Sequence, residues 1–102
     1  MSQSFMEPEP QEYPIDGVLD LHVFEPSDLG DLVPEYLHAC REESILRVRI
    51  IHGKGTGQLR RSVRSILDRL EGVIRYETAK DQSSWGATIA FLAEEGSLEL
   101  ER

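Results

Sequence analysis

The spacing of hydrophobic residues changes several times along this chain, and this alternation restricts the fold more than any other feature of the sequence. Apolar residues two apart predict strands, and apolar residues three and four apart predict amphipathic helices. The expected elements are, in chain order, a strand over 18–23, a helix from about 32 to 43, a strand over 46–51, a helix over 59–70 and strands over 73–78 and 85–92. The order βαβαββ predicts an α/β fold, a two-layer sandwich of the α+β kind whose two helices cover one face of the sheet.

The ends of the helices are expected at residues that favour or interrupt a helical backbone. Ser27 is a suitable N-cap for the first helix. Because Pro34 lacks an N–H and is unfavourable inside a helix, we expect an opening turn near 27–30 and the main helix from about Leu32. Gly72 is expected to end the second helix.

Length and composition limit the class of protein. With 102 residues, of which 39% are hydrophobic, the chain has room for one small domain, expected over 15–93. Residues 1–14 are acidic and rich in proline, which predicts a disordered leader, and 94–102 are expected to form an acidic tail. Cys40 is the only cysteine, so an internal disulfide is excluded and a reducing, cytoplasmic location is favoured. No apolar run is long enough to cross a membrane.

The two signs of charge are separated along the chain, although the total is −8. Residues 20–43 hold seven acidic residues against one arginine, which is a net charge of −6. Residues 47–75 have a net charge of +6, because two acidic residues face eight basic ones: Arg47, Arg49, Lys54, Arg60, Arg61, Arg64, Arg69 and Arg75. Such a basic block favours a phosphate-bearing partner, and a merely solvated dipolar domain is the alternative.

Two chemically distinctive segments follow the first two expected strands. If these strands are parallel, their carboxyl ends lie at the same edge of the sheet, where ligands of open α/β sheets bind. This topology would bring Asp20-Leu21-His22 close to His52-Gly53-Lys54-Gly55-Thr56-Gly57. In the second segment, the glycines allow backbone N–H groups to approach an anion, and Lys54 and the following helix N-terminus add positive charge. Because the spacing is that of neither a Walker loop nor a dinucleotide fingerprint, we expect a simpler phosphate-binding loop.

These residues are suited to the cleavage of phosphodiester bonds. His22 and His52 are candidates for general acid and base, and Asp20 for the carboxylate that orients a histidine. Lys54 and the loop amides would neutralise charge on the phosphate oxygens. In an alternative arrangement, Asp20, His22 and His52 hold a divalent metal such as Mg²⁺ or Mn²⁺. We favour a metal-free or metal-assisted site over a tightly held metal.

Each residue also has an ordinary structural explanation. Asp20 could pair with Arg47 or Arg49 across the open face of the sheet, and His52 could be satisfied by the backbone at the start of a helix. The glycines of the loop could serve a tight turn only. Taken together, however, the two segments are difficult to explain by turn geometry alone.

Both segments resemble the signature motifs of the Smr (small MutS-related) domain family, of its stand-alone bacterial type. The matching stretches are Leu19-Asp20-Leu21-His22 and His52-Gly53-Lys54-Gly55-Thr56-Gly57-Gln58-Leu59-Arg60. The resemblance covers about residues 17–92, and Trp85-Gly86-Ala87-Thr88-Ile89 is similar to the family's final Gly-x-Thr strand. It implies a fold like that of the C-terminal domain of translation initiation factor three, with a mixed four-stranded sheet and two helices.

The resemblance also implies a nucleic acid as partner, since Smr domains are described as nicking endonucleases on DNA and, in some members, as RNA endonucleases. The motif match carries over Asp20 and His22 from the Leu-Asp-x-His motif, and residues 52–55 from the His-Gly-x-Gly motif. One position departs from the pattern: Val23 stands where many members have glycine, and a branched residue restricts the backbone there.

The function predicted first is therefore an Smr-type endonuclease that cleaves phosphodiester bonds of DNA or RNA. The alternative is a non-catalytic module that binds a nucleic acid or a ribosome, with Arg60, Arg61 and Arg64 as the main contacts. A third hypothesis is a small phosphorylated ligand in the glycine-rich loop, with Trp85 as a stacking residue.

Overall fold

The computed structural model describes residues 14–80 and 86–94 of the chain. Its regular elements are β1 (Val18–Asp20), the 3₁₀ helices η2 (Leu21–Val23) and η3 (Pro26–Asp28), α1 (Leu29–Glu42), β2 (Arg47–Ile51), α2 (Gln58–Asp68), β3 (Val73–Thr78) and β4 (Ala87–Leu92). The expected leader, apart from Pro14, the acidic tail after Glu94, and Trp85 lie outside the described residues.

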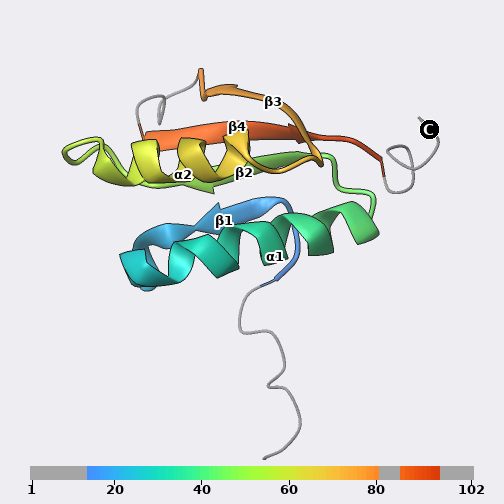
Figure 1. The fold of residues 1–102 in the computed structure, drawn as a ribbon, viewed down its shortest axis with the longest axis horizontal. Coiled ribbons are helices and arrows are strands. Elements are labelled where there is room, and N and C mark those ends of the chain that lie inside the picture. Colours follow the sequence, from blue (N-terminus) through green and yellow to red (C-terminus); the bar gives the residue numbers. More distant parts are fainter. Residues whose placement is uncertain (1–13, 81–85, 95–102) are drawn as a thin grey trace, which may run out of the picture.

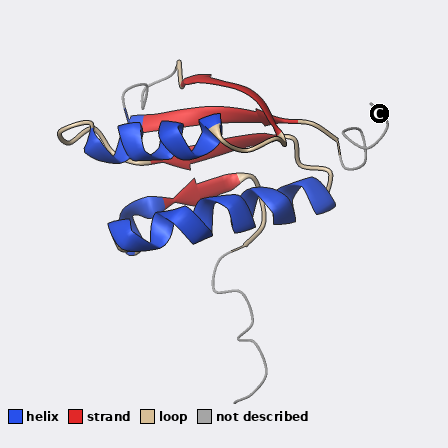
Figure 2. Ribbon diagram, in the orientation of Figure 1, coloured by secondary structure: helices blue, strands red, loops and turns tan. Residues whose placement is uncertain are grey.

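The strands form one mixed four-stranded sheet in the order β1-β2-β4-β3. β1 and β2 are parallel, whereas β2 with β4 and β3 with β4 are antiparallel. Both helices lie in front of the sheet in the view of Figures 1 and 2. The predicted α+β sandwich with two helices on one face is thus confirmed.

The main core lies between the helices and the sheet. Val48 and Ile50 of β2 are fully buried in this core. Arg47 and Arg49 alternate with them along the strand and lie on the opposite face of the sheet. α1 and α2 each contribute one apolar stripe to this core. The opposite face of the sheet carries a smaller apolar cluster around Ile89. No helix in the described part of the chain is long and apolar enough to cross a membrane.

β1 is shorter than the strand expected over 18–23. The Asp20 carboxylate accepts a hydrogen bond from the backbone N–H of His22 at 2.9 Å, and the chain turns there into η2. Val23, expected on the buried face of the strand, is 80% exposed. The alternation of apolar residues therefore predicted too long a strand, because the Asp20 side chain accepts a backbone hydrogen bond at this point.

α1 begins earlier than expected and continues through Pro34. The proline costs the helix one hydrogen bond near its start, but the earlier start buries Leu29, which is only 2% exposed. The predicted N-cap was wrong as well, because Ser27 lies within η3 and Asp28 occupies the cap position without a side-chain bond. Burial of the apolar stripe outweighs both local signals.

α2 ends at Asp68, two residues before the predicted end, and is followed by a turn that leads into β3. β3 has the bounds expected from the sequence, and β4 begins at Ala87, one residue after Gly86, and ends at Leu92 as predicted. The sheet register places Thr88 of β4 opposite both Ile50 of β2 and Thr78 of β3.

Candidate active site

Asp20 and His22 form an exposed pair where β1 ends. Asp20 Oδ1 lies 2.6 Å from His22 Nδ1, and the two side chains are 54% and 65% exposed. The pKa of Asp20 is lowered, mainly because its carboxylate accepts the backbone N–H of His22, and also because it faces the imidazole. A ring nitrogen this close to a carboxylate carries the hydrogen, so His22 Nε2 is the nitrogen that can accept a proton from a substrate.

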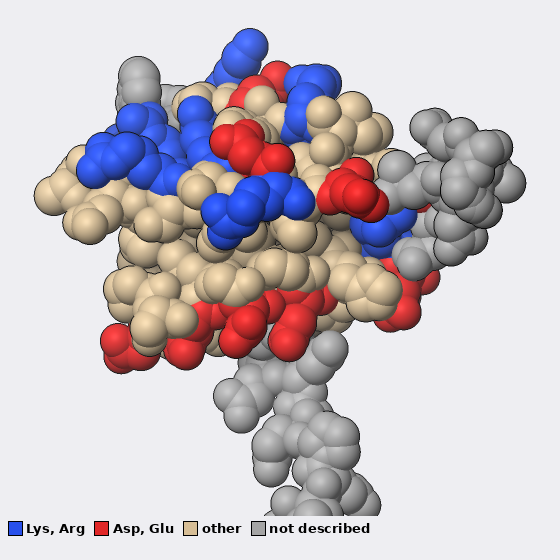
Figure 3. All heavy atoms as spheres, viewed as in Figure 1, with Lys and Arg blue, Asp and Glu red and all other residues tan. Residues whose placement is uncertain are grey.

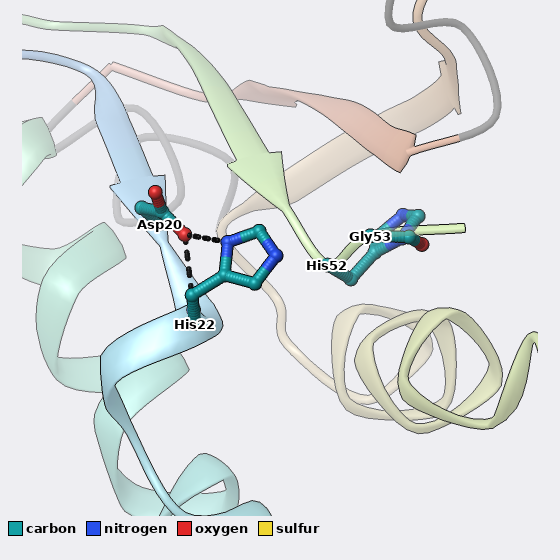
Figure 4. Close-up of polar contacts among 4 residues, drawn as sticks. All are labelled: Asp20, His22, His52 and Gly53. Atoms are coloured by element: carbon teal, nitrogen blue, oxygen red, sulfur yellow. Dashed lines mark hydrogen bonds and ion pairs between the residues drawn. The ribbon is translucent and has the colours of Figure 1, made fainter. Parts of the chain in front are cut away.

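His22 Nε2 points toward the segment that follows β2 (Figure 4). A Cβ atom placed on Gly53 would lie 3.5 Å from this nitrogen, and Gly53 has a φ of +82°. The structure therefore brings the two predicted segments together at one edge of the sheet, although 30 positions separate the two histidines in sequence. Glycine at position 53 leaves the space in front of His22 open.

His52 belongs to the same edge but is oriented differently. It is only 5% exposed, and Figure 4 shows its ring pointing away from His22. Its Nδ1 lies 3.0 Å from the Gly53 carbonyl oxygen and its Nε2 lies 2.8 Å from Thr88 Oγ1. Burial lowers the pKa of His52, and the positive charges of Arg64 and Arg60 lower it further. This geometry differs from the predicted pair of facing acid and base, because both ring nitrogens already have partners within the protein.

The loop between β2 and α2 encloses a cavity of about 400 Å³. Its lining consists of residues 52–59 together with Pro26 and Ser62. Thr56 Oγ1 accepts the N–H of Gln58 at the start of α2, and Gly57, with a φ of +88°, precedes the helix. Lys54, Gly55 and Thr56 are exposed at this loop. The loop thus places glycines with positive φ and an exposed lysine at a helix N-terminus, and its binding of an anion stays a prediction.

Arg60 and Arg61 lie beside this loop. A Cβ on Gly57 would be 3.4 Å from Arg61 Nη1 and 3.9 Å from Arg60 Nη2. A neighbouring hollow of about 500 Å³ continues along α2 and is lined by Arg61, Ser65 and Arg69. The hollow extends the basic surface beyond the loop.

Arg47 and Arg49 lie elsewhere, on the face of the sheet opposite to α2. The structure therefore divides the basic residues that the sequence grouped together. In Figure 3, Lys and Arg side chains gather over α2, while Asp and Glu side chains follow α1.

Arg64 points inward rather than toward the loop. Its Nη2 donates to Thr78 Oγ1 at 2.9 Å, both Nε and Nη2 lie 3.3 Å from Thr88 Oγ1, and the guanidinium lies 5.4 Å from the ring centre of Tyr76. These bonds use its Nε and Nη2 inside the protein, and the contact with phosphate that the sequence suggested for Arg64 stays a prediction. Thr88, fully buried at the centre of this arrangement, was not predicted as a site residue. The Gly-x-Thr signal in the last strand could have drawn attention to it.

The donor atoms for the alternative metal site do not all lie together. Within residues 14–80 and 86–94, no group of three or more His, Cys, Asp or Glu side chains could hold a metal ion. Asp20, His22 and His52 do not form one, since the ring of His52 is turned away and hydrogen-bonded at both nitrogens. These three residues therefore do not form the tightly held Mg²⁺ or Mn²⁺ site of the alternative hypothesis.

The family model of the Smr domain matches residues 19–93, which include β1 except its first residue, both motif segments and β4. The chain belongs to the Smr domain family. This Smr domain is 39% identical over 66 residues to endonuclease MutS2 of Bacillus mycoides, and 37% identical over 60 residues to endonuclease MutS2 of Agathobacter rectalis. These matches cover 65% and 58% of the chain, which spans about 8% of the length of each of these relatives.

Solved structures show the same fold. The Smr domain of Thermus thermophilus MutS2 matches with a TM-score of 0.70 and 28% identity, over 76% of this chain and 99% of that one. YdaL, a stand-alone small MutS-related protein from Escherichia coli, matches with a TM-score of 0.66 and 26% identity, over 81% of this chain and 69% of that one. The resemblance inferred from the two motifs is thus confirmed.

Proposed function

We propose that this Smr domain is an endonuclease that cleaves phosphodiester bonds of DNA or RNA. The observation that carries the proposal is the exposed Asp20–His22 pair, whose outward Nε2 faces a glycine-rich loop with the character of a phosphate site. The names of the MutS2 relatives, which are endonucleases, support the same reaction class.

In the proposed reaction, His22 Nε2 takes the proton of the attacking oxygen, which belongs to a water molecule or to a ribose 2′-hydroxyl. The new phosphorus–oxygen bond forms as the bond to the leaving oxygen breaks, and a water molecule gives that oxygen a proton. Asp20 holds the imidazole by its Nδ1 hydrogen and stabilises the imidazolium that forms. Lys54 and the N–H groups of the loop neutralise the charge that develops on the phosphate oxygens.

The test compares two variants in which a histidine is replaced by alanine, one at the proposed site and one away from it. His22→Ala should reduce cleavage of supercoiled DNA or structured RNA by about 10²–10⁴, because the proton acceptor is lost. His38→Ala is the matched control, since His38 is also exposed but pairs with Glu42 on α1. Rates are measured by single-turnover assays on both nucleic acids, with and without a chelator. Equal rates for the two variants would contradict the proposal.

A second function, binding without cleavage, is favoured by the basic surface formed by Lys54, Arg60, Arg61 and Arg69 beside the loop. A nucleic acid or a ribosome would then be the partner. The two functions separate in one experiment: a wild-type protein that binds DNA or RNA, shifts it on a gel and leaves it intact is a binding module. The same result would overturn the cleavage mechanism above.

A further inference from the structure

The hydroxyl of Thr88 connects α2 to the loop after β2. This residue is fully buried, and its Oγ1 lies 2.8 Å from His52 Nε2 and 3.3 Å from Arg64 Nε and Nη2. A guanidinium can only donate, so Thr88 Oγ1 accepts from Arg64. The single hydrogen of the hydroxyl is then available for His52 Nε2, which accepts it.

The other nitrogen of His52 gives the same assignment independently. Nδ1 lies 3.0 Å from the carbonyl oxygen of Gly53, and a carbonyl oxygen carries no hydrogen. Nδ1 must therefore carry the hydrogen and donate it. The two contacts together define a neutral ring with its hydrogen on Nδ1, in agreement with the lowered pKa of this buried side chain.

The guanidinium of Arg64, which donates to Thr88, is also held by contacts with β3. Nη2 donates to Thr78 Oγ1 of β3 at 2.9 Å, and the guanidinium faces the ring of Tyr76. The Tyr76 hydroxyl donates to Asp68 Oδ1 of α2 at 2.7 Å. These contacts connect α2 to β3 and β4, and Thr88 of β4 connects them to His52 at the start of the loop.

The path ends on the residue that faces His22. The Gly53 carbonyl accepts from His52, and the Gly53 N–H donates to the Gly86 carbonyl at 2.9 Å. Gly86 also approaches closely, since a Cβ placed on it would lie 3.6 Å from Gly53 Cα and 3.7 Å from Lys54 Cγ. A rotation of the His52 ring would break its bond to the Gly53 carbonyl and leave Gly53 held by Gly86 alone among these contacts.

We propose that Arg64 and Thr88 are positioning residues, which set the tautomer of His52 and thereby hold the Gly53–Gly57 loop at the distance from His22 that the reaction needs. This inference rests on the proposed endonuclease function. It assigns Arg64 a role distinct from phosphate binding and gives His52 no part in proton transfer.

The first test reads the tautomer and needs no activity. Long-range ¹H–¹⁵N NMR of the His52 ring at neutral pH should show the hydrogen on Nδ1 in the wild type and in Thr88→Ser, which keeps the hydroxyl. Thr88→Val removes the hydroxyl with little change of shape, so that only the contact of Nδ1 with the Gly53 carbonyl still holds the tautomer, and the share of rings with the hydrogen on Nε2 should rise above that of the wild type. A wild-type ring with its hydrogen on Nε2, or with both nitrogens protonated, would overturn the inference even if no Thr88 variant folds.

The second test separates positioning from phosphate binding. Arg64→Met and Arg61→Met remove the same charge from α2. Arg64→Met should lower kcat about tenfold or more with KM within about twofold, because a misplaced loop weakens the transition state. Arg61→Met should mainly raise KM or the Kd for the nucleic acid. An Arg64→Met variant that raises KM as much as Arg61→Met does, with kcat unchanged, would contradict the positioning role.

The two proposals fail in different ways. If the wild type has the expected tautomer but cuts neither DNA nor RNA, the endonuclease function is wrong, while the contact path from Arg64 to Gly53 stands. If the wild type cuts and Thr88→Val cuts equally fast with a disturbed His52 ring, the function stands and the positioning role is wrong.

Discussion

His22 and His52 lie at the same edge of the sheet, yet burial gives the two imidazoles different chemistry. His22 is 65% exposed and its Nε2 faces the glycine-rich loop, whereas His52 is 5% exposed and bonded at both nitrogens. A proton acceptor has to reach its substrate, so the exposed ring is the one suited to the reaction. Gly53 lies beside His22 Nε2, so the side chain at position 53 would determine how closely the proposed substrate approaches that nitrogen.

Replacing Gly53 by alanine should therefore affect both activity and stability. The methyl group would lie 3.5 Å from His22 Nε2 and obstruct the attacking oxygen, and the φ of +82° is unfavourable for a residue with a Cβ. We expect a loss of activity of at least about tenfold and a fall of about 1–2 kcal/mol in the free energy of unfolding. Urea denaturation and single-turnover cleavage measure the two effects.

The control is Gly30→Ala in α1, where an added Cβ has no atom within 4 Å. This variant should be as stable as the wild type or more stable by up to about 1 kcal/mol, because alanine favours the helix. An equal loss of activity in Gly30→Ala and Gly53→Ala would refute the local explanation.

Among the elements, α1 fixes the position of β1, the short strand that carries Asp20. The buried hydroxyl of Tyr36 accepts the N–H of Gly17 at 3.1 Å and donates to the carbonyl of Val18 at 3.0 Å. Burial raises the pKa of Tyr36 to about 12. A strand of three residues has few hydrogen bonds of its own, so this contact from the helix contributes to its placement.

Removal of that hydroxyl by Tyr36→Phe should lower the free energy of unfolding by about 1–3 kcal/mol, because a buried N–H at Gly17 loses its partner. Tyr76→Phe is the comparison, since the Tyr76 hydroxyl bonds to Asp68 at an exposed position. That variant should change stability by about 0.5 kcal/mol or less. Chemical denaturation of both variants provides the measurement, and a larger loss for Tyr76→Phe would show that the α1–β1 contact is not the stronger one.

Across the whole molecule, the two helices of one layer carry opposite charge. Exposed acidic residues follow α1, and exposed basic residues follow the loop and α2 (Figure 3). A polyanion is therefore attracted to the α2 side and repelled from the α1 side, although the chain as a whole carries a net charge of −8. The charge distribution over the surface, and not the total, determines where a nucleic acid would bind.

This asymmetry predicts a steep salt dependence of binding that depends on particular arginines. Arg61→Met should reduce the slope of log K against log [salt] by about one, because one phosphate contact is lost. Arg47→Met removes the same charge from the opposite face of the sheet and should leave the slope nearly unchanged. Fluorescence titrations with a labelled oligonucleotide at several salt concentrations would measure the two slopes. Equal slopes for both variants would contradict a binding surface along α2.

The periodicity of apolar residues was sufficient to predict the order of the elements, because burial of one face is a local property of a strand or helix. The parallel pairing of the first two strands then placed Asp20, His22 and the glycine loop at one edge. Local signals failed at Asp20, where a side chain turned the strand into η2, and at Pro34, where core burial overrode helix propensity.

The roles of the polar residues were decided only by the tertiary structure. The sequence contained His22, His52 and all the arginines, but the inward bond of the His52 ring is to Thr88, which lies 36 positions away. The inward orientation of Arg64 likewise depends on β3 and β4. Exposure and protonation are set by contacts between distant segments, and these contacts exist only after the chain has packed.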